Sequence, residues 1–304
     1  MSFAMCCRAK SARVIFNPKF TPGETLIYQI EMQTTTAGKT TTPIVNNEGA
    51  SEASLRIGMR ERLEVLAVSA QDASVRFRLT WDESHADAIS DTLDPTAADP
   101  SAPFKQLEGN AVEFTLSPNG ALSNFKGLEN VLPGGMPPPE SVAWIAALAA
   151  PNAFPRGGIE IGQNWKAERP IDGAPLANLF WSTESAYDRD ERCPTFGVAP
   201  KTPQPVQQCA VIISHMSIAR HGGGRSDQTP PDYLHNGLRT AGTWTGSGQE
   251  MGSISTQTGL LVSATETSSQ DMDYTITSAS SGSSIHYTAK VQSQTGITLV
   301  SQSQ

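Results

Sequence analysis

A histidine followed by three glycines, His221-Gly222-Gly223-Gly224, is the most direct match to a catalytic motif in this sequence. Such a segment could form an oxyanion hole, in which backbone N–H groups converge on a developing negative charge. A hydrolase of this kind also needs a Gly-x-Ser-x-Gly turn between a strand and a helix, and Gly246-Ser247-Gly248 lacks that spacing. We interpret the segment as a loop before Pro230-Pro231, and keep a hydrolase that uses His221 and an unidentified serine as an alternative function.

The residues that usually bind metals or nucleotides form no such site here. His215, His221 and His235 are six and fourteen residues apart, unlike the i, i+4 pair that places two imidazoles on one helical face. The acidic segment 82–99 lacks the central glycine of a calcium-binding loop. The glycines at 242, 246, 248 and 252 do not form a Gly-x-Gly-x-x-Gly pattern, and we assign them to strand bulges and turns. The sequence therefore predicts no metal, no cofactor and no catalytic residue.

The charge of the chain argues against nucleic acid as a partner. The formal net charge is −8 and the pI is near 5.2, so a phosphate backbone would be repelled. Residues 241–304 contain 14 Ser and 11 Thr but only five Asp, Glu, Lys or Arg residues, a composition typical of secreted β-sheets. We therefore expect a periplasmic or secreted bacterial protein.

The N-terminal residues do not supply a signal for export. No apolar run approaches the roughly 20 residues of a membrane-spanning helix, and Met1–Ser11 has no continuous apolar core of the signal-peptide kind. We expect no transmembrane segment, and a signal peptide whose start is missing from the sequence.

The four cysteines form two pairs of different character. Cys6 and Cys7 are adjacent near the start of the chain, and we assign them no role. Cys193 and Cys209 bracket a proline-rich segment with strand-like sequence on both sides. In an oxidising compartment we predict a disulfide between them, with two buried free thiols as the alternative.

Alternation of apolar and polar residues dominates the sequence, and it is the pattern of strands with one buried face. The runs Leu55–Val65 and Val75–Trp81 flank the turn Ser69–Ser74 and predict a hairpin. A second hairpin is predicted where Val112–Leu116 and Ala121–Phe125 flank Pro118-Asn119-Gly120, because Asn-Gly supplies the positive φ angles of a tight turn.

Later runs of the same kind indicate a meander without crossover helices. The expected strands are Leu179–Tyr187, Cys209–Ala219, Gly259–Thr267, Met272–Thr277 and Ile285–Val291. Only Glu140–Ala150, between prolines, has helical periodicity.

The predicted fold is therefore mainly β: an antiparallel sandwich or partly open barrel with one short helix. We divide it into an N-terminal antiparallel β unit at 13–132, a Pro-rich linker with the helix at 133–155, and a C-terminal antiparallel β unit at 156–301. The entry Pro22-Gly23-Glu24 and the restart at Gly162-Gln163-Asn164-Trp165 suggest that the two units are related, although chance similarity is an equal alternative.

The segment Phe20–Tyr28, the hairpins and the Gly162-Gln163-x-Trp165 restart give the chain a family resemblance. It resembles uncharacterised secreted β-rich bacterial proteins and, more remotely, the half-barrel carriers that move lipoproteins and lipids across the periplasm. The resemblance extends over most of the chain in its pattern of strands and turns, and its motifs are unspecific. It implies that the protein carries a lipid-like ligand, but it places none of the carriers' functional residues on this sequence.

Two groups of residues are candidates for binding. Apolar residues of the second hairpin and the predicted helix would line a cavity for a lipid-like ligand, or else form plain core: Phe114, Leu116, Val142, Trp144, Ile145 and Leu148. Arginines at the polar positions of the alternating pattern in the first hairpin would form a patch for an anionic partner: Arg56, Arg60, Arg62, Arg76 and Arg78. The alternative for the arginines is ordinary cross-strand pairing with Glu31, Glu64 and Glu113.

We expect a protein without enzymatic activity that binds a hydrophobic or lipid-like ligand or another component of the cell envelope. Besides the hydrolase, a passive module that docks an envelope protein through an exposed sheet edge remains an alternative.

Overall fold

The computed structural model describes most of the chain. The described residues are 13–16, 18–41, 50–91, 102–117, 122–128, 154–155, 157–171, 173–194, 207–222 and 228–303.

Eleven strands of the described chain form one antiparallel sheet. They are β1 (Thr25–Thr41), β2 (Ala50–Val68), β3 (Val75–Ser90), β4 (Ala111–Leu116), β5 (Leu122–Lys126), β6 (Asn164–Pro170), β7 (Leu179–Arg192), β8 (Gln208–Arg220), β9 (Leu238–Ser255), β10 (Leu261–Ser278) and β11 (Ser284–Ser303). Their order in the sheet is β5-β4-β3-β2-β1-β11-β10-β9-β8-β7-β6. The predicted mainly β, antiparallel class is confirmed, and the sheet is open rather than closed into a barrel.

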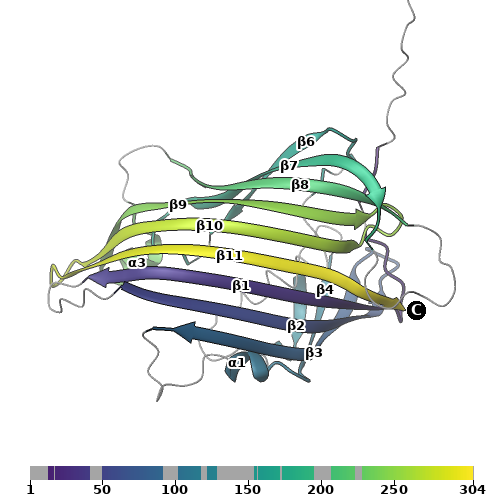
Figure 1. Ribbon diagram of the computed structural model, residues 1–304, viewed down its shortest axis with the longest axis horizontal. Helices are drawn as coiled ribbons and strands as arrows, with labels where there is room; N and C mark the ends of the chain where they lie inside the picture. Colours follow the sequence, from purple (N-terminus) through teal and green to yellow (C-terminus); the bar gives the residue numbers. More distant parts are fainter. Residues whose placement is uncertain are drawn as a thin grey trace, which may run out of the picture.

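This order is two meanders joined at one seam. Strands β1 to β5 follow one another outward in one direction, and β11 back to β6 do so in the other. At the seam β1 pairs with β11, from Thr25 opposite Ser303 to Thr41 opposite His286. The first and last strands of the sequence therefore lie side by side in the middle of the sheet (Figure 1).

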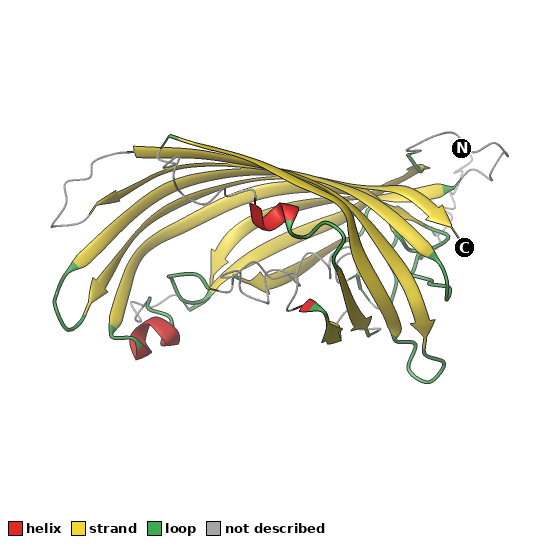
Figure 2. Cartoon of the chain, turned by 90° about the horizontal axis from the view of Figure 1, so that it is seen from below, coloured by secondary structure: helices red, strands yellow, loops and turns green. Residues whose placement is uncertain are grey.

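The sheet is arched rather than flat. Figure 2 shows the strands bending over the side on which the short helices lie. Two single-turn helices are described, α1 (Ala102–Lys105) and α3 (Pro231–His235). The helix expected at 140–150 lies outside the described residues. Both predicted β units supply strands to the same sheet, and their boundaries stay a prediction.

The predicted hairpins form at the expected places. Strands β2 and β3 pair around a turn in which the Ser69 N–H donates to the Ser74 carbonyl at 2.8 Å. Strands β4 and β5 pair from Leu116 opposite Leu122 to Glu113 opposite Lys126. The residues of the second turn, 118–121, lie outside the described residues.

Two details of the later strands differ from the prediction. The two runs expected at 259–267 and 272–277 belong to the single strand β10, because Ser268 to Asp271 keep the same alternation with polar side chains on both faces. The glycine-rich segment is not a series of turns but the long strand β9. A Cβ on Gly246 would lie 2.8 Å from Ile218 Cδ1, and one on Gly248 would lie 2.9 Å from Met216 Cε. These glycines therefore make room for side chains of β8 within an unbroken strand.

The alternation of side chains divides the sheet into an inner face, toward the helices, and an outer face. The main core lies on the inner face of β1 to β4 and includes Tyr28, Leu63, Phe77 and Phe114, none more than 1% exposed. A second cluster around Ile159 and Tyr187 lies under β7 to β10, and a third joins Leu176 and Leu179. Burial of these apolar surfaces stabilises the arch.

The predicted disulfide is present between Cys193 and Cys209. Cys193 follows the end of β7, and Cys209 lies near the start of the neighbouring strand β8, with the Cα atoms 4.8 Å apart. Both cysteines are buried with Val262. The bond closes a short loop and is of the kind found in oxidising compartments.

We predict that Cys193→Ser/Cys209→Ser lowers the free energy of unfolding by about 3 kcal/mol, because the bond restricts the unfolded chain. Urea denaturation followed by tryptophan fluorescence measures the change. The control variant Cys6→Ser/Cys7→Ser removes two thiols and keeps the bridge, so its midpoint should match the parent. Equal midpoints for the parent with and without reductant would contradict this account.

One buried carboxyl lies within the main core. Glu61 on β2 is fully buried opposite Tyr28, whose hydroxyl donates to the Leu261 carbonyl at 3.1 Å. Burial raises the pKa of the Glu61 carboxyl well above its usual range, and the nearby Trp81 indole offsets only part of that effect. Glu61 is therefore a neutral acid inside the core under mildly acidic conditions.

This placement makes stability depend on pH. The folded state holds the Glu61 proton more tightly than the unfolded chain, so the Glu61 contribution to stability falls as pH rises above the ordinary carboxyl range. We expect Glu61→Gln to raise the free energy of unfolding at pH 8 by about 1 kcal/mol or more, and to have a smaller effect at pH 5.

Thermal denaturation across pH 5 to 8 measures this dependence. Glu61→Gln removes the titrating proton and keeps a hydrogen-bonding side chain, whereas Glu61→Leu removes both. The two variants together therefore separate titration from hydrogen bonding. Both variants should flatten the decline toward high pH. A parent and variants with parallel pH profiles would show that the Glu61 proton is not held in this way.

Candidate functional site

Two of the six residues predicted to line a ligand cavity are described, and both belong to the main core. Phe114 and Leu116 on β4 are buried there, where the Phe114 ring lies 5.5 Å from Phe77 and 6.2 Å from Phe125 between centroids. A role for them in ligand binding stays a prediction. The other four predicted residues lie outside the described residues: Val142, Trp144, Ile145 and Leu148.

A different apolar surface is only partly covered on the inner face. It lies on the middle strands β9, β10 and β11, beyond the end of the main core, and its side chains are half-buried. Two of them, Trp244 and Tyr274, pack at one end against the cluster of Leu176 and Leu179. We call it the inner band: Trp244, Met272, Tyr274, Tyr287, Ala289 and Val291.

The strand register brings the inner band together. Met272 lies between Trp244 of β9 and Ala289 of β11, and Tyr274 lies opposite Tyr287. The two tyrosine rings are stacked with centroids 5.2 Å apart. The Trp244 indole donates to Gln270 Oε1 at 3.0 Å, which holds one ring edge while the rest of the indole stays apolar.

The environment of Tyr274 in the inner band is partly desolvated. Burial is the main cause that raises the pKa of the Tyr274 hydroxyl, followed by Tyr287 and by Tyr233 of α3. No charged side chain belongs to the inner band. The surface therefore suits an apolar ligand better than an ionic one.

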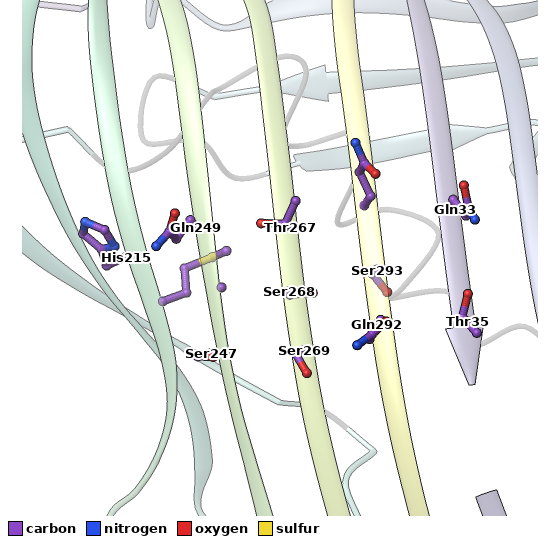
Figure 3. A pocket seen from close by; sticks show the side chains of 13 residues that line it. Gln33, Thr35, His215, Ser247, Gln249, Thr267, Ser268, Ser269, Gln292 and Ser293 are labelled. Carbon is purple, nitrogen blue, oxygen red and sulfur yellow. The ribbon is translucent and has the colours of Figure 1, made fainter. Parts of the chain in front are cut away.

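The outer face of the same strands carries a hollow of about 650 Å³, which we call the outer groove. It crosses β1, β11, β10, β9 and β8, and Figure 3 shows its polar side chains on neighbouring strands. The outward-facing residues are Gln33, Thr35, His215, Ser247, Gln249, Thr267, Ser269, Gln292 and Gln294, and Met216, Gly248, Ser268 and Ser293 complete the lining.

The five predicted arginines of the anionic-partner patch lie on β2 and β3, and most face carboxylates. Arg62 donates to Asp82 at 3.0 Å and to Glu64 at 2.6 Å. Arg76 and Arg78 both pair with Glu113, and Arg56 donates to Gln33 Oε1 at 3.4 Å. Arg60 lies on β2 opposite Gln29 and Glu83.

These contacts are mostly the cross-strand pairing that the sequence offered as the alternative. Glu64 and Glu113 are among the expected partners, while Asp82 is an addition that arises because a bulge lies between Arg60 and Glu61. Hydrogen bonds from Arg78 and Arg76 lower the pKa of the Glu113 carboxyl. An anionic ligand would have to compete with these carboxylates, and its binding here stays a prediction.

His221, the histidine of the His-Gly-Gly-Gly segment, contacts a glutamate rather than a serine. His221 Nε2 shares a hydrogen bond of 2.8 Å with Glu168 Oε2, and the ring packs edge-on against Phe180 at 4.5 Å. Across the described part of the chain, no three His, Cys, Asp or Glu residues come together as a metal site. No described helix is long and apolar enough to span a membrane.

Sequence reasoning found the strands that carry these surfaces but not the surfaces themselves. The strand expected at 285–291 forms part of β11, and its residues Tyr287, Ala289 and Val291 share the inner face. Trp244, which lies opposite Met272, belongs to the unpredicted strand β9, so the inner band could be recognised only once β9 and its register were known.

Comparisons with known proteins define the fold and little more. No protein-family model and no curated protein sequence matches the chain. A solved structure that describes lipid–protein interactions in lipovitellin is similar to it, with a TM-score of 0.50 and 11% sequence identity. The similarity covers 94% of this chain and 26% of that chain, so this protein spans about a quarter of its length. At this identity the likeness shows a shared fold.

Proposed function

We propose that the protein is a non-enzymatic binder of a lipid-like ligand, and that the inner band of the arched sheet contacts the apolar part of that ligand. The observation that carries the proposal is the half-buried state of six apolar or aromatic side chains on the inner face. Contiguous apolar surface that a chain leaves partly uncovered marks binding sites, because its removal from water is favourable.

The fold supports the same proposal. The similar structure concerns lipid–protein interactions in lipovitellin, and the similarity of fold covers 94% of this chain. A wide arch gives an elongated apolar ligand contact with several strands at once. The disulfide supports a place for this function in the periplasm or outside the cell.

The sheet edges favour this function over docking through strand addition. The edge strands β5 and β6 are five and seven residues long. Beyond Thr80, β3 also has no described strand on its β4 side, and this stretch carries the acidic residues Asp82, Glu83 and Asp87. Strand β6 carries Lys166, which pairs with Glu184 at 3.5 Å, and Glu168, and it ends at Pro170. Short edges with charges and a terminal proline resist the pairing of another strand.

We predict that Val291→Glu weakens the binding of oleic acid by about tenfold or more, because a buried carboxylate would face the acyl chain. Gln292→Glu is the matched control: it adds the same charge to the neighbouring position of β11, but on the outer face. Native mass spectrometry of protein incubated with oleic acid measures occupancy, and isothermal titration calorimetry measures affinity.

Thermal denaturation of both variants shows whether each remains folded, and Met272→Gln provides a milder change within the same band. The proposal predicts a loss of binding in Val291→Glu and Met272→Gln alone. Parent protein that binds neither oleic acid nor phospholipid, or equal binding by the inner-face and outer-face variants, would refute it.

A further inference from the structure

We propose that the outer groove is a second binding site, and that its ligand is a neutral oligosaccharide or polysaccharide. The site is independent of the inner band, because alternate side chains of the same strands point to opposite faces of the sheet. The first evidence is its shape: a shallow, open hollow of about 650 Å³ lies on the outer face, and most of its outward-facing side chains are exposed to solvent.

The groove is organised as two rows of side chains across the strands. In the first row Gln33, Gln294, Thr267, Gln249 and His215 lie opposite one another on five successive strands. Neighbouring strands are about 4.8 Å apart, so this row spans about 19 Å. A surface of that length can contact several linked sugar rings.

A second row lies two residues away from the first. It contains Thr35, Gln292, Ser269 and Ser247 on four of these strands, β1, β11, β10 and β9. Together the rows place amide groups, which both donate and accept, beside hydroxyl groups, which do the same. This set of groups matches a ligand whose own surface is covered with hydroxyls.

The lining contains no Asp, Glu, Lys or Arg, although the protein is acidic. His215 is its one ionisable side chain, and Arg56 lies beside the groove, where it donates to Gln33. Charged side chains line the next hollow along the same strands, where Asp271 lies 3.7 Å from Lys290. A phosphorylated or sulfated ligand would find no Lys or Arg among the lining residues, whereas a neutral sugar chain needs none.

The polar groups of the groove are available for a ligand. Among hydrogen bonds between described residues, Gln33 is the only outward-facing side chain of the groove with a partner, Arg56. The groove offers no aromatic pocket of the kind that anchors a protein partner. The chemistry of the site therefore favours a carbohydrate over a protein.

The test combines a glycan array with two matched substitutions. Thr267→Val removes a hydroxyl from the groove, and Thr265→Val removes the same group from an exposed outward position of β10 that does not line it. Gln294→Leu removes an amide from the centre of the first row. The array should contain neutral glucans, mannans, galactans and chitin oligosaccharides beside anionic alginate and heparin.

We expect the parent to bind at least one neutral glycan, and Thr267→Val/Gln294→Leu to bind it about tenfold more weakly, since a site built for hydroxyl groups loses affinity when its polar partners are removed. Thr265→Val should match the parent, and thermal denaturation shows that all variants are folded. Binding to no neutral glycan, binding to anionic glycans alone, or unchanged affinity in the double variant overturns the proposal.

Discussion

The pairing of β1 with β11 is the contact on which the whole sheet depends. Each of the two meanders is built from neighbours in sequence, and among the described strands this is the one ladder that joins them. The seam runs the length of β1, and Gln302 adds a side-chain hydrogen bond of 2.6 Å to the buried Glu24 at its end. The ladder joins residues 25–41 to residues 286–303, so it is the most non-local pairing in the sheet.

Of the two candidate binding surfaces, the outer groove crosses the seam and the inner band lies beside it. The inner band uses β9 to β11, and the outer groove extends from these strands across the seam to β1. Side-chain alternation then assigns apolar residues such as Met272 and Val291 to one face, and polar residues such as Thr267 and Gln292 to the other. One layer of strands thereby offers an apolar surface and a hydrogen-bonding surface that do not interfere with each other.

Much of the fold could be predicted from the sequence, because alternation is a local signal. It identified the β2–β3 hairpin and the strands that begin at Leu179 and Cys209. The alternation did not predict strand β9, because Gly246 and Gly248 were interpreted as turn or bulge residues. In the structure these glycines lie within the strand and leave space for the side chains of Ile218 and Met216. Tertiary packing set the meaning of those glycines, and no local pattern contains that information.

The candidate sites were less predictable for a related reason. Phe114 was expected at a cavity because it is aromatic and faces inward, but inward-facing aromatic residues of a wide sheet also form its core. Whether a given apolar residue is covered depends on which strands curl over it, and that depends on register and arch. The arginines were correctly placed on one hairpin, while their partners depended partly on the bulge beside Arg60.

The central claim is that an apolar ligand lies against the inner band. Methyl NMR spectra recorded with a spin-labelled stearic acid test it most directly, because the nitroxide broadens nearby signals. The account predicts strong broadening of the Met272, Ala289 and Val291 methyl groups and sharp signals for Thr265 and Thr267 on the opposite face. Broadening confined to the outer face, or none at any methyl group, would contradict it.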